Sequence, residues 1–522
     1  MPPLPLTGRD LTVDDVVEVA RQRRPVVLDP SAAERMQASR RVIERLVADG
    51  ATVYGVTTGF GDLADVRIDP DQTADLQRNL VRSHAAGVGE PLPAEVVRAM
   101  LLLRANTLAI GLSGVRVEIA ELLCGMLNAA VHPVIPSRGS VGASGDLAPL
   151  AHLALVMIGE GEAEVDGAGP GPGGHALRRA GLGPVTLEAK EGLALLNGTQ
   201  LMAGIGGLAV ADGLRLVDTA DVTGAMSLEA LEGTAAAFDA QLIGARPHPG
   251  QLRSAVQLRS LLAESEIGAS HRQSPHRVQD PYSLRCMPQV HGAVRDALDQ
   301  LAGVLAIEMN AATDNPLVFP ASREAPDGRV VSGGNFHGEP IALALDAATI
   351  ALAELANIGE RRVARLVDQH LSGLPAFLTP RSGLRSGLMI AQYTAAACVN
   401  ELRGLAHPAT VDNVPTSANQ EDHVSMGATA AHQLRQAVAL VESVLAIEAL
   451  CAAQALDFRA PLRPGRGVRL AHAAVREVVP PLDEDRPPGP DIERVAGLVR
   501  SGALARPARE ASHAATAGAS RG

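Results

Sequence analysis

The chain of 522 residues contains no tryptophan, three tyrosines, six phenylalanines and four cysteines. With so few aromatic side chains, a core must be filled mainly by leucine, valine, isoleucine and alanine, which suits closely packed helices. The cysteines lie far apart and form no Cys-x-x-Cys pair, so their spacing argues against a disulfide framework and a zinc knuckle. We interpret all four as reduced thiols in the core or near a site: Cys124, Cys286, Cys398 and Cys451.

Positive charge is also scarce, because 46 lysines and arginines face 58 acidic residues and the net charge is -12. Such a surface has no general attraction for phosphate backbones or anionic membranes, so we expect neither a nucleic-acid nor a membrane partner. The most apolar stretch, 341–356, is interrupted by Asp346 and Glu354, and no apolar run reaches the roughly 18 residues that cross a bilayer. The first residues lack the basic lead and apolar segment of an export signal, which predicts a cytoplasmic location.

Apolar residues recur at helical spacing in three stretches, 289–309, 341 to about 371, and 431–458. This periodicity predicts a bundle of three or more helices of roughly 20 to 30 residues. Residues 50–200 are rich in turns and should hold shorter helices, loops and a few short strands. We therefore predict a mainly α protein with an N-terminal lobe (1–200), a long-helix bundle (201–460) and a C-terminal helical segment (461–522) that ends in a small, polar, unordered tail.

The run VDGAGPGPGGHA at 165–176 has glycine spacing that faintly resembles a dinucleotide-binding turn. Prolines alternate with its glycines, and no strand is expected before it, whereas that turn needs a preceding strand. We interpret the run as an exposed loop.

The tripeptide Ala143-Ser144-Gly145 offers unusual chemistry. If the backbone bends tightly, the Gly145 nitrogen can attack the carbonyl carbon of Ala143, and a glycine leaves no Cβ in the way. Loss of one water closes a five-membered ring, and loss of the serine hydroxyl as a second water leaves an exocyclic methylidene. The product, 4-methylidene-imidazol-5-one, is a strong electrophile.

A turn followed by a helix cap is the ordinary alternative for this tripeptide. Asp146 can cap a helix that begins at Leu147, with Pro149 tolerated in its first turn. A serine-hydrolase elbow is excluded, because Gly-x-Ser-x-Gly needs glycine at position 146 and aspartate stands there. Taken alone, the tripeptide does not decide between a turn and an electrophile.

The surrounding segment, GSVGASGDLAPLAH (139–152), resembles the signature of the aromatic amino acid ammonia-lyase family, whose members form this ring autocatalytically. Seven further blocks resemble family blocks in the family's order: VYGVTTGFG (53–61), QRNLVRSHAAGVG (77–89), KEGLALLNGT (190–199), RVQDPYSLRCMPQV (277–290), DNP (314–316), GGNFHGEP (333–340) and PTSANQEDHVSMG (415–427). The resemblance covers residues 10 to 460 or so.

The resemblance implies a cofactor built from Ala143, Ser144 and Gly145, with no dissociable cofactor and no metal. It also implies a helical homotetramer of the fumarase and aspartase kind, in which each active site draws residues from more than one chain. The reaction it implies is the elimination of ammonia from an α-amino acid. The electrophile either makes the amine a better leaving group or attacks the aromatic ring and acidifies the β-proton, and both routes stay open.

The resemblance assigns catalytic roles to two tyrosines. Tyr54 lies in a glycine-flanked loop and would be the base that removes the β-proton. A phenol has a reference pKa of about 10, so nearby positive charge or hydrogen bonds must lower it for work at neutral pH. Tyr282 is similar to the family's second active-site tyrosine, near the ring and the leaving amine. A structural tyrosine is the alternative, but the chain has only three.

Four other residues are identified as substrate-binding through the resemblance. Arg285 offers a guanidinium fork that suits the substrate carboxylate, although a lone arginine is more often in a surface salt bridge. Gln279 and Asn197 are amides that can orient the substrate or the ring, or can be satisfied buried amides. Phe336 is similar to the residue that packs on the ring, and a plain core phenylalanine is the alternative.

Two positions point to the substrate side chain. His84 can hydrogen-bond an imidazole, and Glu421 offers a carboxylate to an imidazole N–H. A carboxylate facing a benzene ring would be buried without a partner, which is costly. The pair therefore favours L-histidine, with trans-urocanate as product, over a tyrosine or phenylalanine ammonia-lyase or an aminomutase with the same electrophile.

More distant alternatives have less support. A lyase of the fumarase and aspartase kind should carry a GSSxMPxKxN-like loop, which the chain lacks, and an inactive scaffold would be expected to have lost Ser144 or Tyr54. The remaining histidines show no metal-like spacing and are interpreted as structural, among them His132, His152, His337 and His423.

Overall fold

A computed structural model describes residues 1–51, 53, 72–272 and 278–510 of the chain. The described part is mainly helical, which confirms the predicted fold class. Its α-helices are α1 (Val13–Arg21), α2 (Pro30–Ala48), α3 (Thr73–His84), α4 (Ala94–Ala109), α5 (Val117–Asn128), α6 (Leu147–Met157), α7 (Gly173–Arg179), α8 (Glu191–Leu196), α9 (Gln200–Ala230), α10 (Ala240–Gly244), α11 (Pro249–Leu261), α12 (Glu266–Ser270), α13 (Tyr282–Arg285), α14 (Met287–Glu308), α15 (Glu339–Val367), α16 (Gln369–Ser372), α17 (Met389–Leu405), α18 (Gly427–Asp457), α19 (Arg466–Val478) and α20 (Gly489–Arg500).

The strands are short and form small sheets. They are β1 (Leu4–Leu6), β2 (Val26–Leu28), β3 (Val88–Pro91), β4 (Val131–Pro133), β5 (Pro136–Arg138), β6 (Glu162–Val165), β7 (Ala168–Pro172), β8 (Leu317–Phe319) and β9 (Arg329–Val331). β1 pairs with β2 in parallel, and the antiparallel neighbours are β3 with β5, β4 with β6, β6 with β7, and β8 with β9. The predicted mixture of short helices and strands over 50–200 is confirmed for the described residues of that range.

The chain divides into two compact units, each assembled from three separate stretches. Unit 1 comprises Met1–Ala211, Leu301–Asp346 and Pro408–His432, and unit 2 comprises Asp212–Gln300, Ala347–His407 and Gln433–Gly522. Four of the five boundaries fall inside the long helices α9, α14, α15 and α18, and the fifth falls just after α17. The linear division at residues 200 and 460 stays a prediction. The unordered tail was predicted to begin at Ala505, which was wrong for its first part: residues 506–510 are helical, and Ala505 and Ala508 are buried. The rest of the predicted tail, 511–522, lies outside the described residues.

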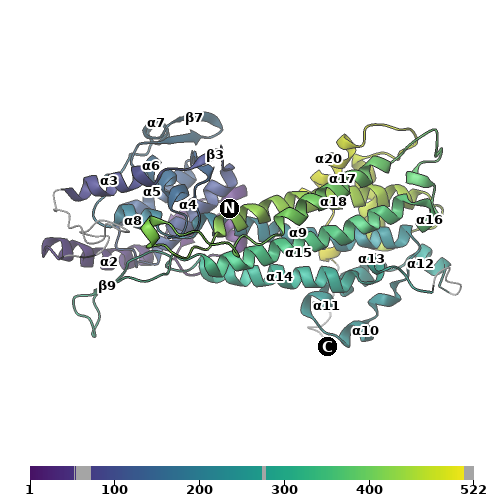
Figure 1. Cartoon of the computed structure of the whole chain (residues 1–522), viewed down its shortest axis with the longest axis horizontal. Coiled ribbons are helices and arrows are strands. Elements are labelled where there is room, and N and C mark those ends of the chain that lie inside the picture. The colour runs from purple at the N-terminus through teal and green to yellow at the C-terminus, as the bar shows by residue number, and fades with distance from the viewer. Residues whose placement is uncertain (52, 54–71, 273–277, 511–522) are drawn as a thin grey trace. The chain divides into compact units, whose positions relative to one another are not determined.

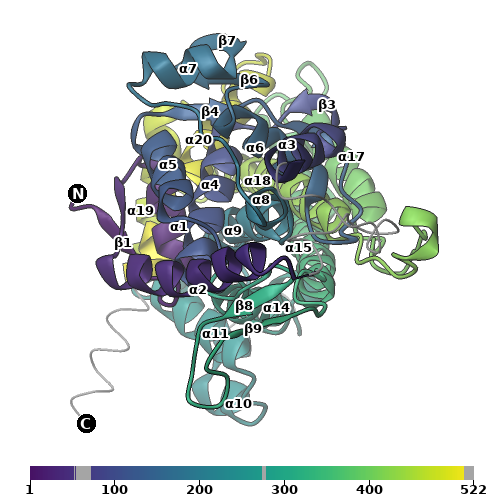
Figure 2. The same cartoon turned by 90° about the vertical axis from the view of Figure 1, so that its left-hand side faces the viewer.

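Unit 1 is built around α4, in which every residue from Val96 to Ala109 is buried. A helix that is buried on all sides belongs to the centre of a core. Helices α3, α6 and α8 lie side by side, and α2 lies beside the hairpin of β8 and β9 (Figure 2). The first helices begin at clear caps: Thr12 and Asp15 form a capping box for α1, and Asp29 caps α2 ahead of Pro30.

In unit 2, parts of α9, α14, α15 and α18 run side by side as a bundle (Figure 1). Its core contains paired charges among the apolar residues. Arg362 of α15 pairs with Glu448 of α18, which also accepts a hydrogen bond from Thr223 of α9. His291 of α14 contacts Asp221 of α9 at 2.8 Å. Because a buried charge is tolerated only when it is paired, these contacts constrain how the four helices pack.

The three long helices predicted from periodicity are confirmed as α14, α15 and α18. The predicted end of the second was wrong: α15 stops at Val367, because the Asp368 side chain accepts from the backbone N–H of His370 and starts α16. Apolar periodicity did not reveal α9, since its glycines weaken the helical pattern. In unit 1 those glycines allow close approach, as at Gly206, where a Cβ would lie 3.1 Å from Leu345.

The structure corrects one further prediction. The run 165–176 is not a plain loop, because β6 precedes it and Ala168–Pro172 forms β7, paired with β6. No dinucleotide-binding turn follows from this hairpin, because β6 and β7 are antiparallel, whereas that turn links a strand to a helix in a parallel βαβ unit.

Three of the long helices are apolar enough to be considered as membrane spans. By length and composition α9, α15 and α18 could each cross a bilayer, but 67–78% of their apolar windows is buried inside the fold. A helix whose apolar residues are already covered by protein has little surface left for lipid, so the burial argues for core helices.

Candidate active site

The tripeptide Ala143-Ser144-Gly145 lies in unit 1, in the loop that joins β5 to α6. Three glycines of this loop have positive φ: +149° at Gly139, +70° at Gly142 and +77° at Gly145. This left-handed region is strained for residues with a Cβ, so glycines permit a bend that other residues would resist. Ala143 is buried and Ser144 is half-buried. The loop therefore has the tight backbone that ring closure requires.

Gly145 is pressed against the backbone of Gly198, in the turn between α8 and α9. The two glycines form a parallel β-bridge, and the Asp146 N–H donates to the Gly198 carbonyl at 2.7 Å. A Cβ on Gly145 would lie 2.2 Å from the Gly198 oxygen, so only glycine fits. The residues present thus fit the methylidene-imidazolone: a glycine supplies the attacking nitrogen where no side chain has room.

Asp146 stands at the N-cap of α6, as predicted, but it does not cap that helix with its side chain. Its carboxyl accepts instead from the backbone N–H groups of Leu201 and Met202, at 2.9 and 3.1 Å, in the first turn of α9. Ser140 donates to its other oxygen. Burial raises the pKa of Asp146 to about 7, and these hydrogen bonds oppose the shift. Asp146 thus ties the tripeptide loop to the start of α9.

Glu421 meets the tripeptide directly. The Ser144 hydroxyl donates to Glu421 Oε1 at 2.9 Å, and Thr416 donates to Oε2 at 2.7 Å. Ser144 and Glu421 are 277 positions apart in the chain. Glu421, predicted to bind the substrate side chain, therefore lies in direct contact with Ser144, which is predicted to form the electrophile.

His84, at the end of α3, belongs to the same neighbourhood. Its Nδ1–H donates to the Leu80 carbonyl at 2.9 Å, which leaves Nε2 as an acceptor in the neutral ring. Burial lowers the pKa of His84, and its hydrogen bond to Leu80 and the charge of Glu421 partly oppose the shift. A neutral histidine near Glu421 is suited to accept a hydrogen bond from an imidazole N–H.

Asn197 and Phe336 are also in unit 1. Asn197 is buried, caps the end of α8 and directly precedes Gly198. Phe336 is half-buried in the loop before α15. Two residues further on, a Cβ at Gly338 would lie 3.0 Å from Ser425 Oγ, and Ser425 donates to the Gly142 carbonyl. Both residues thus lie in segments that pack beside the tripeptide loop.

The other predicted residues line a cavity of about 510 Å³ in unit 2. Gln279, Tyr282 and Arg285 stand on its wall, and the Arg285 guanidinium lies 4.7 Å from the Tyr282 ring centre. The Tyr282 side chain is 70% exposed, so the phenol is open to a ligand. Arg365 and His370 line the same cavity. The sequence analysis did not identify these two residues, because neither lies in a recognisable motif.

Tyr54, the predicted base, lies outside the described residues. Its position relative to the tripeptide stays a prediction.

Among the described residues, one group of side chains with metal-ligand atoms lies together, although the spacing along the chain did not indicate it. His337, Glu339 and His423 bring one ligand atom each within 4.8 Å of the others. His337 already uses both ring nitrogens: Nδ1 accepts from the Glu339 N–H, so Nε2 carries the proton and donates to the His423 carbonyl. A metal ligand needs a free lone pair on nitrogen. We therefore assign no metal to this cluster.

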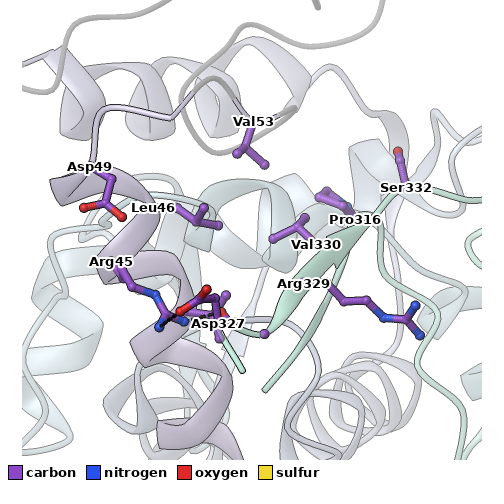
Figure 3. Close-up of a pocket in the computed structure, with 11 residues that line it drawn as sticks. Arg45, Leu46, Asp49, Val53, Pro316, Asp327, Arg329, Val330 and Ser332 are labelled. Carbon is purple, nitrogen blue, oxygen red and sulfur yellow. Dashed lines mark hydrogen bonds and ion pairs between the residues drawn. The ribbon is translucent and has the colours of Figure 1, made fainter. Parts of the chain in front are cut away.

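A separate cavity of about 580 Å³ lies between the end of α2 and the β8–β9 hairpin (Figure 3). Leu46 and Val330 are among its apolar lining residues, and in its wall Arg45 pairs with Asp327. No predicted substrate residue lines it. The hydrogen-bonded cluster around Ser144, which contains predicted site residues, is therefore the better candidate site.

Comparison with known proteins gives full-length matches. The profile of the aromatic amino acid lyase family matches residues 11–477. Histidine ammonia-lyase of Koribacter versatilis is 55% identical over 517 residues, covering 98% of this chain and 100% of the relative. The crystal structure of histidine ammonia-lyase from Trypanosoma cruzi is 44% identical with a TM-score of 0.90, over 98% of this chain and 95% of that one. Tyrosine aminomutase from Streptomyces globisporus is 39% identical with a TM-score of 0.92, over 97% and 98%.

Proposed function

Because the chain belongs to the aromatic amino acid lyase family, we propose that it is a carbon–nitrogen lyase that removes ammonia from L-histidine and releases trans-urocanate. This would be the first step of histidine degradation. The proposal rests above all on one observation, the hydrogen bond from Ser144 to Glu421 in a loop whose Gly145 has no room for a side chain.

Ala143, Ser144 and Gly145 would hold the methylidene-imidazolone. The ring supplies an electrophile that assists departure of the amine or loss of the β-proton. Asn197, beside Gly198, can donate an amide N–H toward the oxygen of this group. Phe336 is the proposed packing partner of the ring, as the family resemblance implies.

The substrate side chain would be recognised by His84 and Glu421. A neutral imidazole carries one N–H donor, and the candidate acceptors here are His84 Nε2 and the Glu421 carboxylate, which also accepts from Ser144 and Thr416. Among the described residues Glu421 has no ion-pair partner, so a donor from the substrate would satisfy it. Relatives that act on histidine support this choice over tyrosine or phenylalanine, since the 55% identity to one of them exceeds the 39% identity to the aminomutase.

The family resemblance implies that Arg285 and Gln279 hold the amino acid end of the substrate. Arg285 is a fixed positive fork for the carboxylate, and Gln279 can orient it without adding charge. Tyr282 is the proposed partner of the leaving amine, and the Arg285 guanidinium lies 4.7 Å from the centre of its ring. Tyr54 is the proposed base.

The proposal includes assembly and location. We propose a homotetramer whose active sites draw residues from more than one chain, as the family resemblance implies. We propose a cytoplasmic location, and the absence of disulfides among the four cysteines, which are free, fits a reducing compartment.

The activity itself has a direct test. Purified protein incubated with L-histidine should release ammonia and an ultraviolet-absorbing product with the spectrum of trans-urocanate, in equal amounts. Protein heated to unfolding serves as the blank. If neither product forms from histidine while tyrosine or phenylalanine is deaminated, the substrate part of the proposal is wrong.

Replacing Tyr54 by phenylalanine should leave the ring formed but strongly reduce turnover. A single general base contributes about 10²–10⁴-fold, so we expect kcat for histidine to fall by that factor while intact mass still lacks two waters. Tyr393→Phe is a matched control, because this tyrosine is exposed on α17 and has no proposed role. A Tyr54→Phe enzyme that keeps more than about a tenth of wild-type kcat would remove Tyr54 from the role of base.

A further inference from the structure

The turn that presses on Gly145 is itself held by a single buried cation. Arg104 of α4 is fully buried. Its Nη1 donates to the Ala194 carbonyl at 2.9 Å, and its Nη2 donates to the Asn197 carbonyl at 2.6 Å and to Gln200 Oε1. These three acceptors span the end of α8, the Gly198 turn and the start of α9. One guanidinium thus fixes both ends of the turn.

Gly198 is squeezed between this cation and the tripeptide loop. Its φ is +147°, and a Cβ there would lie 2.4 Å from Arg104 Nη2. On the other side, the Gly198 carbonyl oxygen accepts from the Asp146 N–H, and Gly145 has no room for a Cβ against the same oxygen. Gly198 therefore lies between Arg104 and Gly145 and is in close contact with both.

The acceptor that completes the clamp is also buried. Gln200 is 3% exposed, and its Nε2 donates to Thr107 and Thr313 at 3.2 and 3.1 Å. Its Oε1 is thereby aimed at Arg104. The guanidinium keeps its positive charge at neutral pH even though burial lowers the pKa of Arg104 to about 10.

We propose that Arg104 is a positioning residue for the formation of the ring: by clamping the Gly198 turn, it holds Gly145 bent toward Ala143. This rests on the proposed function, which requires the ring. The bond that forms joins the Gly145 nitrogen to the Ala143 carbonyl carbon. The Gly145 N–H proton passes to the carbonyl oxygen, which leaves as water with the Ser144 N–H proton. The Ser144 hydroxyl leaves with the Ser144 α-proton as the second water, and no oxidant is needed.

The physical reason is proximity. An amide nitrogen is a weak nucleophile, so closure depends on holding it at bonding approach to the carbonyl carbon. Misplacement by 1 Å can cost about 10²-fold in rate. A turn freed from Arg104 could relax away from Gly145 by such a distance, because Ala194, Asn197 and Gln200 would lose their shared donor.

The chain offers a matched control on the same helix. Arg98 of α4 is 3% exposed and donates to the Val19 and Leu127 carbonyls at 2.7 and 3.0 Å. Burial lowers its pKa to about 10, as for Arg104. Arg98 holds other segments and does not contact the Gly198 turn. Losing either arginine should lower stability, but only Arg104 should affect the ring.

The test measures maturation rather than turnover. Wild type, Arg104→Met, Arg104→Lys and Arg98→Met are synthesised in a pulse, and intact mass is followed over time alongside circular dichroism and Tm. We expect wild type and Arg98→Met to lose two waters completely. Arg104→Met should fold but mature about 10²-fold more slowly. Arg104→Lys should be intermediate, because an ammonium keeps the charge without the fork.

The outcomes separate this inference from the proposed function. If Arg104→Met matures as fast as wild type, or Arg98→Met is delayed as much, the positioning role is overturned while the proposed function stands. If wild type itself keeps both waters, the proposed function fails first. Should neither Arg104 variant be soluble, Gln200→Leu decides: it keeps Arg104 but removes an acceptor of its Nη2, and full, undelayed maturation would overturn the role.

Discussion

Ser144→Ala should abolish the two-water mass loss and, with it, nearly all deamination of histidine. An alanine has no hydroxyl to lose, so no methylidene can form, whereas the fold around it should persist. Ser144 is half-buried, and its one described side-chain contact is the hydrogen bond to Glu421. Loss of a central catalytic group costs on the order of 10³–10⁶-fold in kcat. On one preparation, intact mass measures whether the two waters are lost, Tm measures whether the fold persists, and the urocanate assay measures the remaining activity.

A neighbouring serine provides the control for this variant. Ser425 also lies beside the tripeptide loop, where its hydroxyl donates to the Gly142 carbonyl, but it is not part of the ring. Ser425→Ala should therefore lose two waters and retain activity. A Ser144→Ala protein with near wild-type kcat would disprove the electrophile, and a wild-type peptide carrying unmodified serine at 144 throughout the population would do the same.

Discrimination against phenylalanine should be the second large effect. Phenylalanine has no side-chain N–H for His84 Nε2 or the Glu421 carboxylate, so the hydrogen bond proposed for histidine would be lost. Sites that hydrogen-bond a substrate group reject analogues without that group by roughly 10⁴–10⁵-fold in kcat/KM. Comparing kcat/KM of the wild type for histidine, tyrosine and phenylalanine measures this ratio.

Replacing His84 and Glu421 together should lower the ratio of kcat/KM for histidine to kcat/KM for phenylalanine. His84→Phe with Glu421→Gln removes an acceptor and a charge, so histidine turnover should weaken, although a good phenylalanine lyase is not expected. Because Glu421 also accepts from Ser144, the intact mass of the variant must still show the loss of two waters. That check separates substrate recognition from ring formation. Equal processing of histidine and phenylalanine by the wild type would overturn the substrate assignment but leave the electrophile argument intact.

The parts of the protein that sequence predicted well are those set by local rules. Helical periodicity revealed α14, α15 and α18, since each presents an apolar face every three to four residues. The glycines around Ser144 indicated a tight bend, because positive φ is a property of single residues. The family blocks then identified residue types for each role. The same local rules missed α9, whose glycines lower helix propensity and are explained only by the neighbours that pack on them.

Asp146 shows where local rules end. The sequence alone predicted that it caps α6, the helix that follows it, since aspartate before a helix usually does so. In the structure its carboxyl accepts from Leu201 and Met202 instead, because the start of α9 is brought against it and offers two unpaired N–H groups. Nothing within a few residues of Asp146 carries that information.

The amino-acid sequence by itself determined the chemistry available to this protein: a Ser144 that can be dehydrated, a Gly145 whose nitrogen can close a ring, and side chains suited to an imidazole. Only the tertiary structure decided that Glu421 reaches Ser144 across 277 positions and that Arg104 and Gly198 stand behind Gly145. The reason is physical. The ability to form the ring depends on residues that are adjacent in the sequence. The close packing that holds these residues in place depends on segments that are distant along the chain.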